Sequence, residues 1–170
     1  MTPTLRTARL ILDPYTRDDE ESFVGLFGDE SVSRWMGDGP VPEAENRALF
    51  GRVFTKVYAQ NLFDVWAVRE DGRHIGHAEI KASTEVDGHE IIYALAREAW
   101  GRGLGSEIAE ALIRYGFEVL GLSEVHATVA ASNTGSLALL AKLGFVHVRD
   151  ITEQDGGTTR VLTRRAIAAA

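Results

Sequence analysis

The residues best suited to chemistry form a glycine-rich turn at residues 100–105, Trp-Gly-Arg-Gly-Leu-Gly. Apolar residues recur with helical spacing from there to about residue 120, which predicts a helix that begins in the turn. Glycines at a helix start let an anion approach exposed backbone N–H groups, and the helix dipole adds about half a positive charge. The turn is therefore typical of a pyrophosphate site, although a tight strand-to-helix turn that binds nothing has the same residues.

Two common nucleotide motifs do not match this turn. A Rossmann fingerprint requires G-x-G-x-x-G after a first strand, whereas this turn reads G-x-G-x-G and lies about 100 residues into the chain. A P-loop requires a Gly-Lys pair followed by Ser or Thr, which the sequence lacks. The motifs therefore disfavour NAD and ATP as ligands.

The elements that must position the turn follow from hydrophobic periodicity, capping residues and turn residues. Gly144 is expected to end the last helix as a left-handed cap. No repeat or linker interrupts the pattern, so we expect one domain over residues 1–170 with a core of about 7–165. The predicted strands are 7–14, 63–68, 74–82, 91–96, 125–131, 145–151 and 159–163. One predicted helix begins at Thr16, and the other three span 42–59, 104–120 and 134–143.

Three stretches in this order resemble the GNAT N-acetyltransferase superfamily. Residues 95–107 resemble its acetyl-CoA signature, Gln/Arg-x-x-Gly-x-Gly/Ala, with Trp100 at the position of Gln or Arg. That Trp is similar to the Rim-type branch, which contains the ribosomal-protein alanine N-acetyltransferases. Residues 7–12 (TARLIL) resemble the first strand of this branch, and residues 131–136 (ASNTGS) with 142–145 (KLGF) resemble its second cofactor motif.

The resemblance covers about residues 7–165 and implies a fold and an activity. The implied fold is α+β in α/β/α layers. A mostly antiparallel mixed sheet of about six to seven strands is flanked by about four helices, and its central strands splay at the cofactor site. The implied activity is transfer of an acetyl group from acetyl-CoA to a protein N-terminal α-amine or a small-molecule amine. A non-catalytic CoA-binding sensor or interaction module of the same fold is the alternative.

The resemblance also implies which residues hold the cofactor. Backbone groups of Leu95, Ala96 and Arg97 would bind the pantetheine arm as if it were another strand. Asn133 would bind the pantetheine amide, or alternatively cap the helix that follows it. Ser136 matches the same motif. The N–H groups expected to surround the pyrophosphate belong to Gly101, Arg102, Gly103, Leu104, Gly105 and Ser106.

Acetyl transfer needs a neutral amine, a donor to the carbonyl oxygen and a proton for the leaving thiolate. A backbone N–H of the central strand is the expected donor to the oxygen. Many GNAT enzymes carry a Tyr seven positions after the Asn, where this chain has Leu140, so Ser136 is the candidate donor to the sulfur. Glu90 is the candidate base, acting directly or through a water, and Glu79 is the second option. Each carboxylate could instead be a solvated strand end.

The acceptor is the least determined part of the site. By analogy with the family, Trp35, Met36 and the loop at residues 37–40 are expected to line the acceptor cleft, with a core position as the alternative for Trp35. Glu79 and Tyr93 are the other residues expected to contact the acceptor. A peptide α-amine has a pKa near ~8 and a lysine amine near ~10.4, so a site without a strong base favours amines of low pKa.

Composition narrows the classes of ligand and the cellular location that remain for this chain. The chain has 170 residues, 45% of them hydrophobic and 25% charged, a net charge of −7 and no cysteine. An acidic chain is a poor binder of nucleic acid and of anionic membranes, although it hints at a cationic acceptor. No apolar run approaches the ~20 residues of a membrane helix, and the missing cysteines fit a reducing compartment. We therefore expect a cytoplasmic monomer or homodimer.

The five histidines do not predict a metal site. They are scattered, and no HExxH pattern is present. His74 and His77 are three residues apart on a predicted strand, so the alternation of a strand should place them on opposite faces. We expect no metal cofactor.

Overall fold

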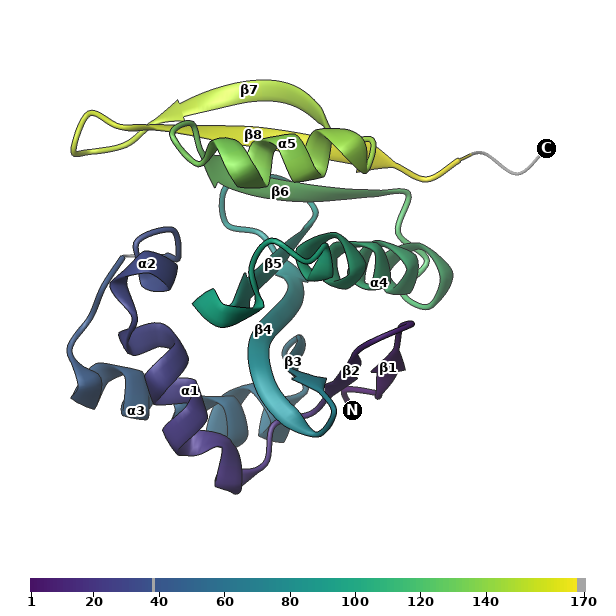
Figure 1. The fold of residues 1–170 in the computed structure, drawn as a ribbon. Helices are drawn as coiled ribbons and strands as arrows, with labels where there is room; N and C mark the ends of the chain where they lie inside the picture. The colour runs from purple at the N-terminus through teal and green to yellow at the C-terminus, as the bar shows by residue number, and fades with distance from the viewer. Residues whose placement is uncertain (38, 168–170) are drawn as a thin grey trace.

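The computed structural model describes residues 1–37 and 39–167. Within them, eight strands form one mixed sheet (Figure 1). In chain order the strands are β1 (Leu5–Arg6), β2 (Ile11–Asp13), β3 (Asp64–Glu70), β4 (Arg73–Ala82), β5 (His89–Leu95), β6 (Glu124–Ala130), β7 (Val146–Thr152) and β8 (Thr158–Arg165).

Helices cover both faces of this sheet, as the predicted α/β/α layers require. On one face α4 packs Ile108 and Leu112 against Trp66 of β3, and on the other face α1 and α3 pack Phe23 and Phe50 against Val65. Neighbouring residues of β3 thus face opposite layers. The helices among the described residues are α1 (Glu20–Gly28), α2 (Glu30–Ser33), α3 (Glu43–Arg52), α4 (Leu104–Glu118) and α5 (Thr134–Lys142).

The predicted fold class is confirmed, with one strand and one helix more than expected. A single strand over residues 7–14 is wrong, because Thr7 N donates to Leu10 O (2.9 Å) and closes a turn, so that β2 begins only at Ile11. The additional strand, β1, lies before this turn. The additional helix is α2, a single turn capped by the Asp29 side chain, which accepts from Ser31 N. The predicted helix over 42–59 is α3 continued by a π-helical turn, Val53–Tyr58.

The sheet divides between β5 and β6. The strand order is β1-β2-β3-β4-β5-β6-β8-β7, and β5–β6 is the parallel pair among otherwise antiparallel neighbours. These two strands pair at Glu90 and His126, near the start of each, and no further register pair joins them within the described residues. Figure 1 shows β6, β8 and β7 standing apart from β1–β4, with β5 between. The predicted splay of the central strands is thereby confirmed.

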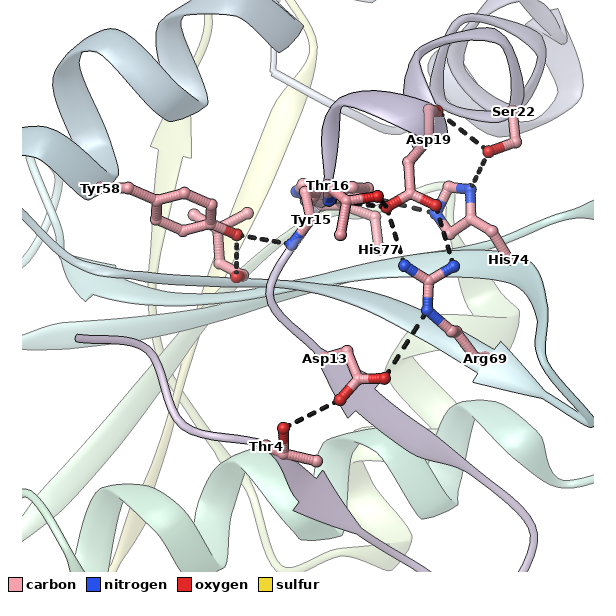
Figure 2. A network of polar contacts seen from close by, with 11 residues as sticks. Thr4, Asp13, Tyr15, Thr16, Asp19, Ser22, Tyr58, Arg69, His74 and His77 are labelled. Atoms are coloured by element: carbon pink, nitrogen blue, oxygen red, sulfur yellow. Dashed lines mark hydrogen bonds and ion pairs between the residues drawn. The ribbon is translucent and has the colours of Figure 1, made fainter.

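A β-bulge in β4 corrects the prediction for the histidines. Val68 pairs with Gly76, but the next residue, Arg69, pairs with His74, so β4 has one extra residue there. An extra residue inverts the alternation of a strand, and His74 and His77 come to lie on the same face. Both reach the Tyr15 hydroxyl, at 3.3 Å and 2.7 Å (Figure 2). The expected opposite faces are therefore wrong.

Candidate active site

Two cavities meet beside the divided strands. The first, of about 500 Å³, opens where β5 leaves β6, and we call it the split cavity. The second, of about 610 Å³, lies between β4 and the helices α1 and α3, and we call it the helical cavity. Met36 lines both cavities, so they adjoin at this side chain.

The glycine-rich turn forms one end of the split cavity. Gly101 and Gly103 have φ of 74° and 78°, a conformation that residues with a Cβ rarely adopt. Gly103 is the N-cap of α4 and, having no side chain, leaves the first-turn N–H groups of the helix without a cap. Gly105 lets α4 approach α5, because a Cβ there would lie 3.0 Å from Leu139 Cδ1. The turn thus presents uncapped donors to the cavity.

Ion pairs hold the turn from behind. Arg102 donates to both carboxylate oxygens of Glu70 (2.9 and 2.6 Å), and this bond lowers the pKa of Glu70. Arg9 donates to Arg102 O (2.9 Å) and to Glu107 Oε2 (2.9 Å). The Arg102 side chain is therefore engaged within the protein, and its backbone N–H is the group left to meet an anion.

The indole of Trp100 donates a hydrogen bond to a backbone carbonyl at one of the positions expected to bind the pantetheine arm. Its Nε1 donates to Leu95 O (2.8 Å), and Ala96 N donates to Ile75 O (2.8 Å). Leu95 lines the split cavity, whereas Arg97 begins a short 3-10 helix and does not. Successive residues of a strand point their backbone groups to opposite sides, so the Leu95 N–H faces the side away from β4.

Asn133 and Ser136 line the opposite wall of the split cavity. Asn133 Oδ1 accepts from Ser136 N (3.3 Å), so Asn133 caps α5 while its Nδ2 is available as a donor. The Ser136 hydroxyl lies 3.5 Å from the Tyr93 hydroxyl of β5. Burial raises the pKa of Tyr93, although the contact with Ser136 lowers it somewhat, so the phenol keeps its proton. Leu140, at the position of the family Tyr, is buried in the core.

The helical cavity has a row of polar residues on β4. His77, Glu79 and Lys81 alternate along the strand and line the cavity together. Glu79 Oε1 accepts from His77 Nε2 (2.8 Å), and its Oε2 lies 3.4 Å from Lys81 Nζ. Burial raises the pKa of Glu79, but His77 and Lys81 lower it more, so the net pKa is below its ordinary value. Glu79 is therefore ionised at neutral pH.

Apolar rings and cations make up much of the remaining lining. Phe23, Phe27 and Phe63 line the helical cavity. The buried Asn46 also lines it, and its Nδ2 has no hydrogen-bond partner among the described residues. The cations are Arg52, Lys56 and Lys81, so the described lining has one carboxylate, Glu79, against three cationic side chains.

The structure separates some of the residues that the sequence grouped. Glu90 is 8% exposed, accepts from Thr128 Oγ1 (3.2 Å) and lines neither cavity. Trp35 is 40% exposed, so a core position is wrong, and it lines the split cavity rather than the helical cavity. Tyr93 is likewise in the split cavity. Gly37 and Gly39 line the helical cavity, and Asp38 lies outside the described residues.

Across residues 1–37 and 39–167, no group of three or more His, Asp or Glu side chains is placed to hold a metal ion. In the same part of the chain, no helix has the length and apolar character needed to cross a membrane.

Comparison with known proteins identifies the family. A model of the acetyltransferase (GNAT) domain matches residues 9–146. The uncharacterised N-acetyltransferase YoaA of Bacillus subtilis is 32% identical over 148 residues, which cover 85% of this chain and 84% of that protein.

Solved structures share the fold. An acetyltransferase from Agrobacterium tumefaciens superposes with a TM-score of 0.82 at 23% identity, covering 98% of this chain and 96% of the other. RimL, a ribosomal L7/L12 α-N-protein acetyltransferase, was solved with coenzyme A and superposes with a TM-score of 0.80 at 12% identity, covering 96% and 98%. The chain belongs to the GNAT family of N-acetyltransferases.

Proposed function

We propose that this N-acetyltransferase binds acetyl-CoA in the split cavity and a primary amine in the helical cavity. The observation that carries the proposal is that the two cavities adjoin at Met36, with hydroxyl groups on one side and an ionised carboxylate on the other. A group-transfer reaction needs this arrangement, because two substrates must meet with their reacting atoms close together.

The split cavity suits acetyl-CoA in charge and in shape. The uncapped N–H groups of Leu104 and Gly105, which line this cavity, suit a pyrophosphate, and the Ser106 N–H follows them in the first turn of α4. The Leu95 N–H and Asn133 Nδ2 are donors for the amide groups of a pantetheine arm. The divided strands leave an open edge beside them, as an extended arm requires.

We assign the proton transfers to residues at the junction of the cavities. Glu79 accepts a proton from the bound ammonium, and the neutral amine attacks the thioester carbon. The new C–N bond forms as the C–S bond breaks. The second amine proton ends on the thiolate, with Ser136 or Tyr93 as the hydroxyl that donates to the sulfur. The products are the acetamide and free thiol, with one proton left on Glu79.

Glu79 replaces Glu90 as our candidate base. Glu79 lines the helical cavity, whereas Glu90 lines neither cavity and is bonded to Thr128. A general base must come within hydrogen-bond reach of the proton that it removes, directly or through one water. Both carboxylates are largely buried, at 17% exposed for the Glu79 side chain and 8% for Glu90, but only Glu79 faces a cavity.

We further propose that the acceptor is an apolar amine that also carries an acidic group. The residues described in the lining of the helical cavity are aromatic rings, one carboxylate and three cations, and a polyamine would meet net repulsion from this set. A single ammonium can pair with Glu79 while a carboxylate lies near Lys56 or Arg52. The acidic balance of the whole chain, −7, does not describe the charge of this cavity.

Calorimetry and turnover test the activity. We expect acetyl-CoA to bind in isothermal titration, and thiol release to follow when primary amines are added. An absence of binding at about 1 mM would contradict the cofactor assignment. Binding without turnover across a broad amine panel would instead support the CoA-binding sensor, the alternative consistent with Leu140 at the position of the family Tyr.

A matched pair of acceptors tests the acceptor class. Apolar amino acids and their carboxamides share a side chain but differ in the acidic group, so we expect the acids to have the lower KM when KM is expressed for the neutral amine in both series. Lys56→Ala should raise KM for the acids about threefold, the size of an exposed ion pair, and leave the amides unchanged. Lys142→Ala, an exposed lysine of α5, is the matched control. A preference for spermidine over both would refute this acceptor class.

A further inference from the structure

We propose that Tyr15 and His77 are positioning residues that orient Glu79 and keep its hydrogen bonding fixed for the acceptor amine. This inference rests on the proposed role of Glu79. The three side chains come from different parts of the chain, with Tyr15 just before α1 and the other two on β4. No motif in the sequence connects them, and their association depends on the tertiary fold.

Two short hydrogen bonds join the three side chains. His77 Nε2 lies 2.8 Å from Glu79 Oε1, and His77 Nδ1 lies 2.7 Å from the Tyr15 hydroxyl. Tyr15 is 3% exposed and His77 is 4% exposed, so water does not compete for these bonds. Figure 2 shows Tyr15 with His77 and His74 beside it.

The direction of each hydrogen bond follows from the charge of Glu79. An ionised carboxylate only accepts, so His77 Nε2 carries the proton that it donates to Oε1. The fold places the Tyr15 O–H at Nδ1 (2.7 Å), and a His77 ring with its N–H at Nε2 accepts the hydrogen bond there. The Tyr15 oxygen can in turn accept from His74 Nε2, at 3.3 Å. Tyr15 therefore selects the His77 tautomer that serves Glu79.

Tyr15 is itself held firmly and stays protonated. Its backbone N donates to the Tyr58 hydroxyl (2.9 Å), which donates to Val65 O (2.7 Å). Its ring packs edge-on against Phe23 and Phe50, with centroids 5.6 and 5.7 Å apart. Burial raises the pKa of Tyr15 well above its ordinary value, with Tyr58 and Glu79 adding to the effect, so the hydroxyl remains a donor at any working pH.

The charged groups around the three side chains leave this arrangement undisturbed. Asp19 and Arg69 pair with each other (2.7 Å), so their charges largely offset (Figure 2). Burial lowers the pKa of His74 to about 4, so His74 is neutral at pH 7. Lys81 follows Glu79 on β4, whereas His77 precedes it, and Lys81 contacts the other carboxylate oxygen, Oε2. Helix α1 packs against His77 through the uncharged rings of Phe23 and Phe27.

Loss of the Tyr15 hydroxyl removes the tautomer preference. His77 then gains nothing from keeping Nδ1 unprotonated, and a fraction of the molecules carries the proton on Nδ1 instead. In that tautomer the Nε2 lone pair faces the Glu79 carboxylate, and the bond at Oε1 is lost. Glu79 is free to change rotamer, and the acceptor amine loses its fixed partner.

The test is Tyr15→Phe, followed by NMR of 15N-labelled histidine. We expect the wild type to show His77 as the Nε2–H tautomer and Tyr15→Phe to show a mixture with Nδ1–H. We expect kcat to fall about 10-fold through misorientation of the base, with KM for acetyl-CoA unchanged. Tyr115→Phe is the matched control, because it also removes a hydrogen-bonded hydroxyl from a buried Tyr, but this hydroxyl is bonded to Asp64 and not to Tyr15 or His77. Its tautomer signal should remain that of the wild type.

A second pair of variants keeps the proposal falsifiable if Tyr15→Phe folds poorly. His77→Gln can still donate an amide N–H to Glu79, whereas His77→Leu cannot, so Gln should retain several-fold more activity than Leu. Equal activity of the two variants, or an unchanged tautomer in a folded Tyr15→Phe, would overturn the positioning role. Glu79→Gln separates the two proposals. If Glu79→Gln retains full activity, the assignment of Glu79 as the base fails. If Glu79→Gln is inactive while the Tyr15 and His77 variants retain full activity, only the positioning role fails.

Discussion

Glu79→Gln provides the sharpest test of the proposed chemistry. The substitution removes the charge and the basicity but preserves the size, and the Gln oxygen can still accept from His77 Nε2. General base catalysis contributes about 10²- to 10⁴-fold. Because His77 and Lys81 hold the pKa of Glu79 below its ordinary value despite its burial, Glu79 is a weak base, and the lower end of that range applies. We expect kcat/KM to fall about 100-fold, equivalent to about 2.7 kcal/mol of transition-state stabilisation.

The assay is thiol release under subsaturating amine, measured from pH 6 to above the pKa of the amine. The loss should be largest where the acceptor arrives as the ammonium and should shrink at high pH, where the amine arrives neutral. Glu90→Gln is the matched control, since Glu90 is also a largely buried carboxylate on a strand but lies outside both cavities. A loss below threefold for Glu79→Gln at pH 7, or an equal loss for Glu90→Gln, would refute the assignment.

Three further substitutions test the turn and the fold. Gly103→Ala should weaken acetyl-CoA binding about 10-fold in calorimetry, because a φ of 78° costs a residue with a Cβ about 1–2 kcal/mol. Trp100→Phe removes the bond to Leu95 O and should raise KM for acetyl-CoA about 2- to 10-fold in steady-state kinetics, the range of one hydrogen bond. Asp19→Asn breaks a buried pair with Arg69 and should cost about 3 kcal/mol in urea unfolding at pH 7. Burial raises the pKa of Asp19, but Arg69 lowers it more, so the net pKa is below its ordinary value. The pair therefore stabilises the fold above about pH 4, and this stabilisation is lost as the pH falls through the folded-state pKa. The variant should lack this pH-dependent loss in acid unfolding.

The sequence by itself determined the features that depend on neighbouring residues. The glycine-rich turn, its helix and the Asn133 cap are local, since glycine conformation, helical periodicity and capping act within a few residues. The resemblance of three ordered motifs to the GNAT superfamily implied the family and the layered fold with its splayed strands. The extra strand, β1, was missed because it has two residues, too few to show the alternation of a strand, and lies before the turn from Thr7 to Leu10.

The tertiary structure decided which side chains share a cavity. Glu79 and Glu90 are both carboxylates on strands, but one faces the helical cavity and the other is bonded to Thr128. The pairing of Tyr93 with Ser136 spans the divided sheet, and a sequence pattern contains no distance between such segments. The bulge in β4 likewise reversed the face of one histidine relative to the other. Non-local contacts set these positions, because strand register and helix packing fix each side chain only after the core has formed.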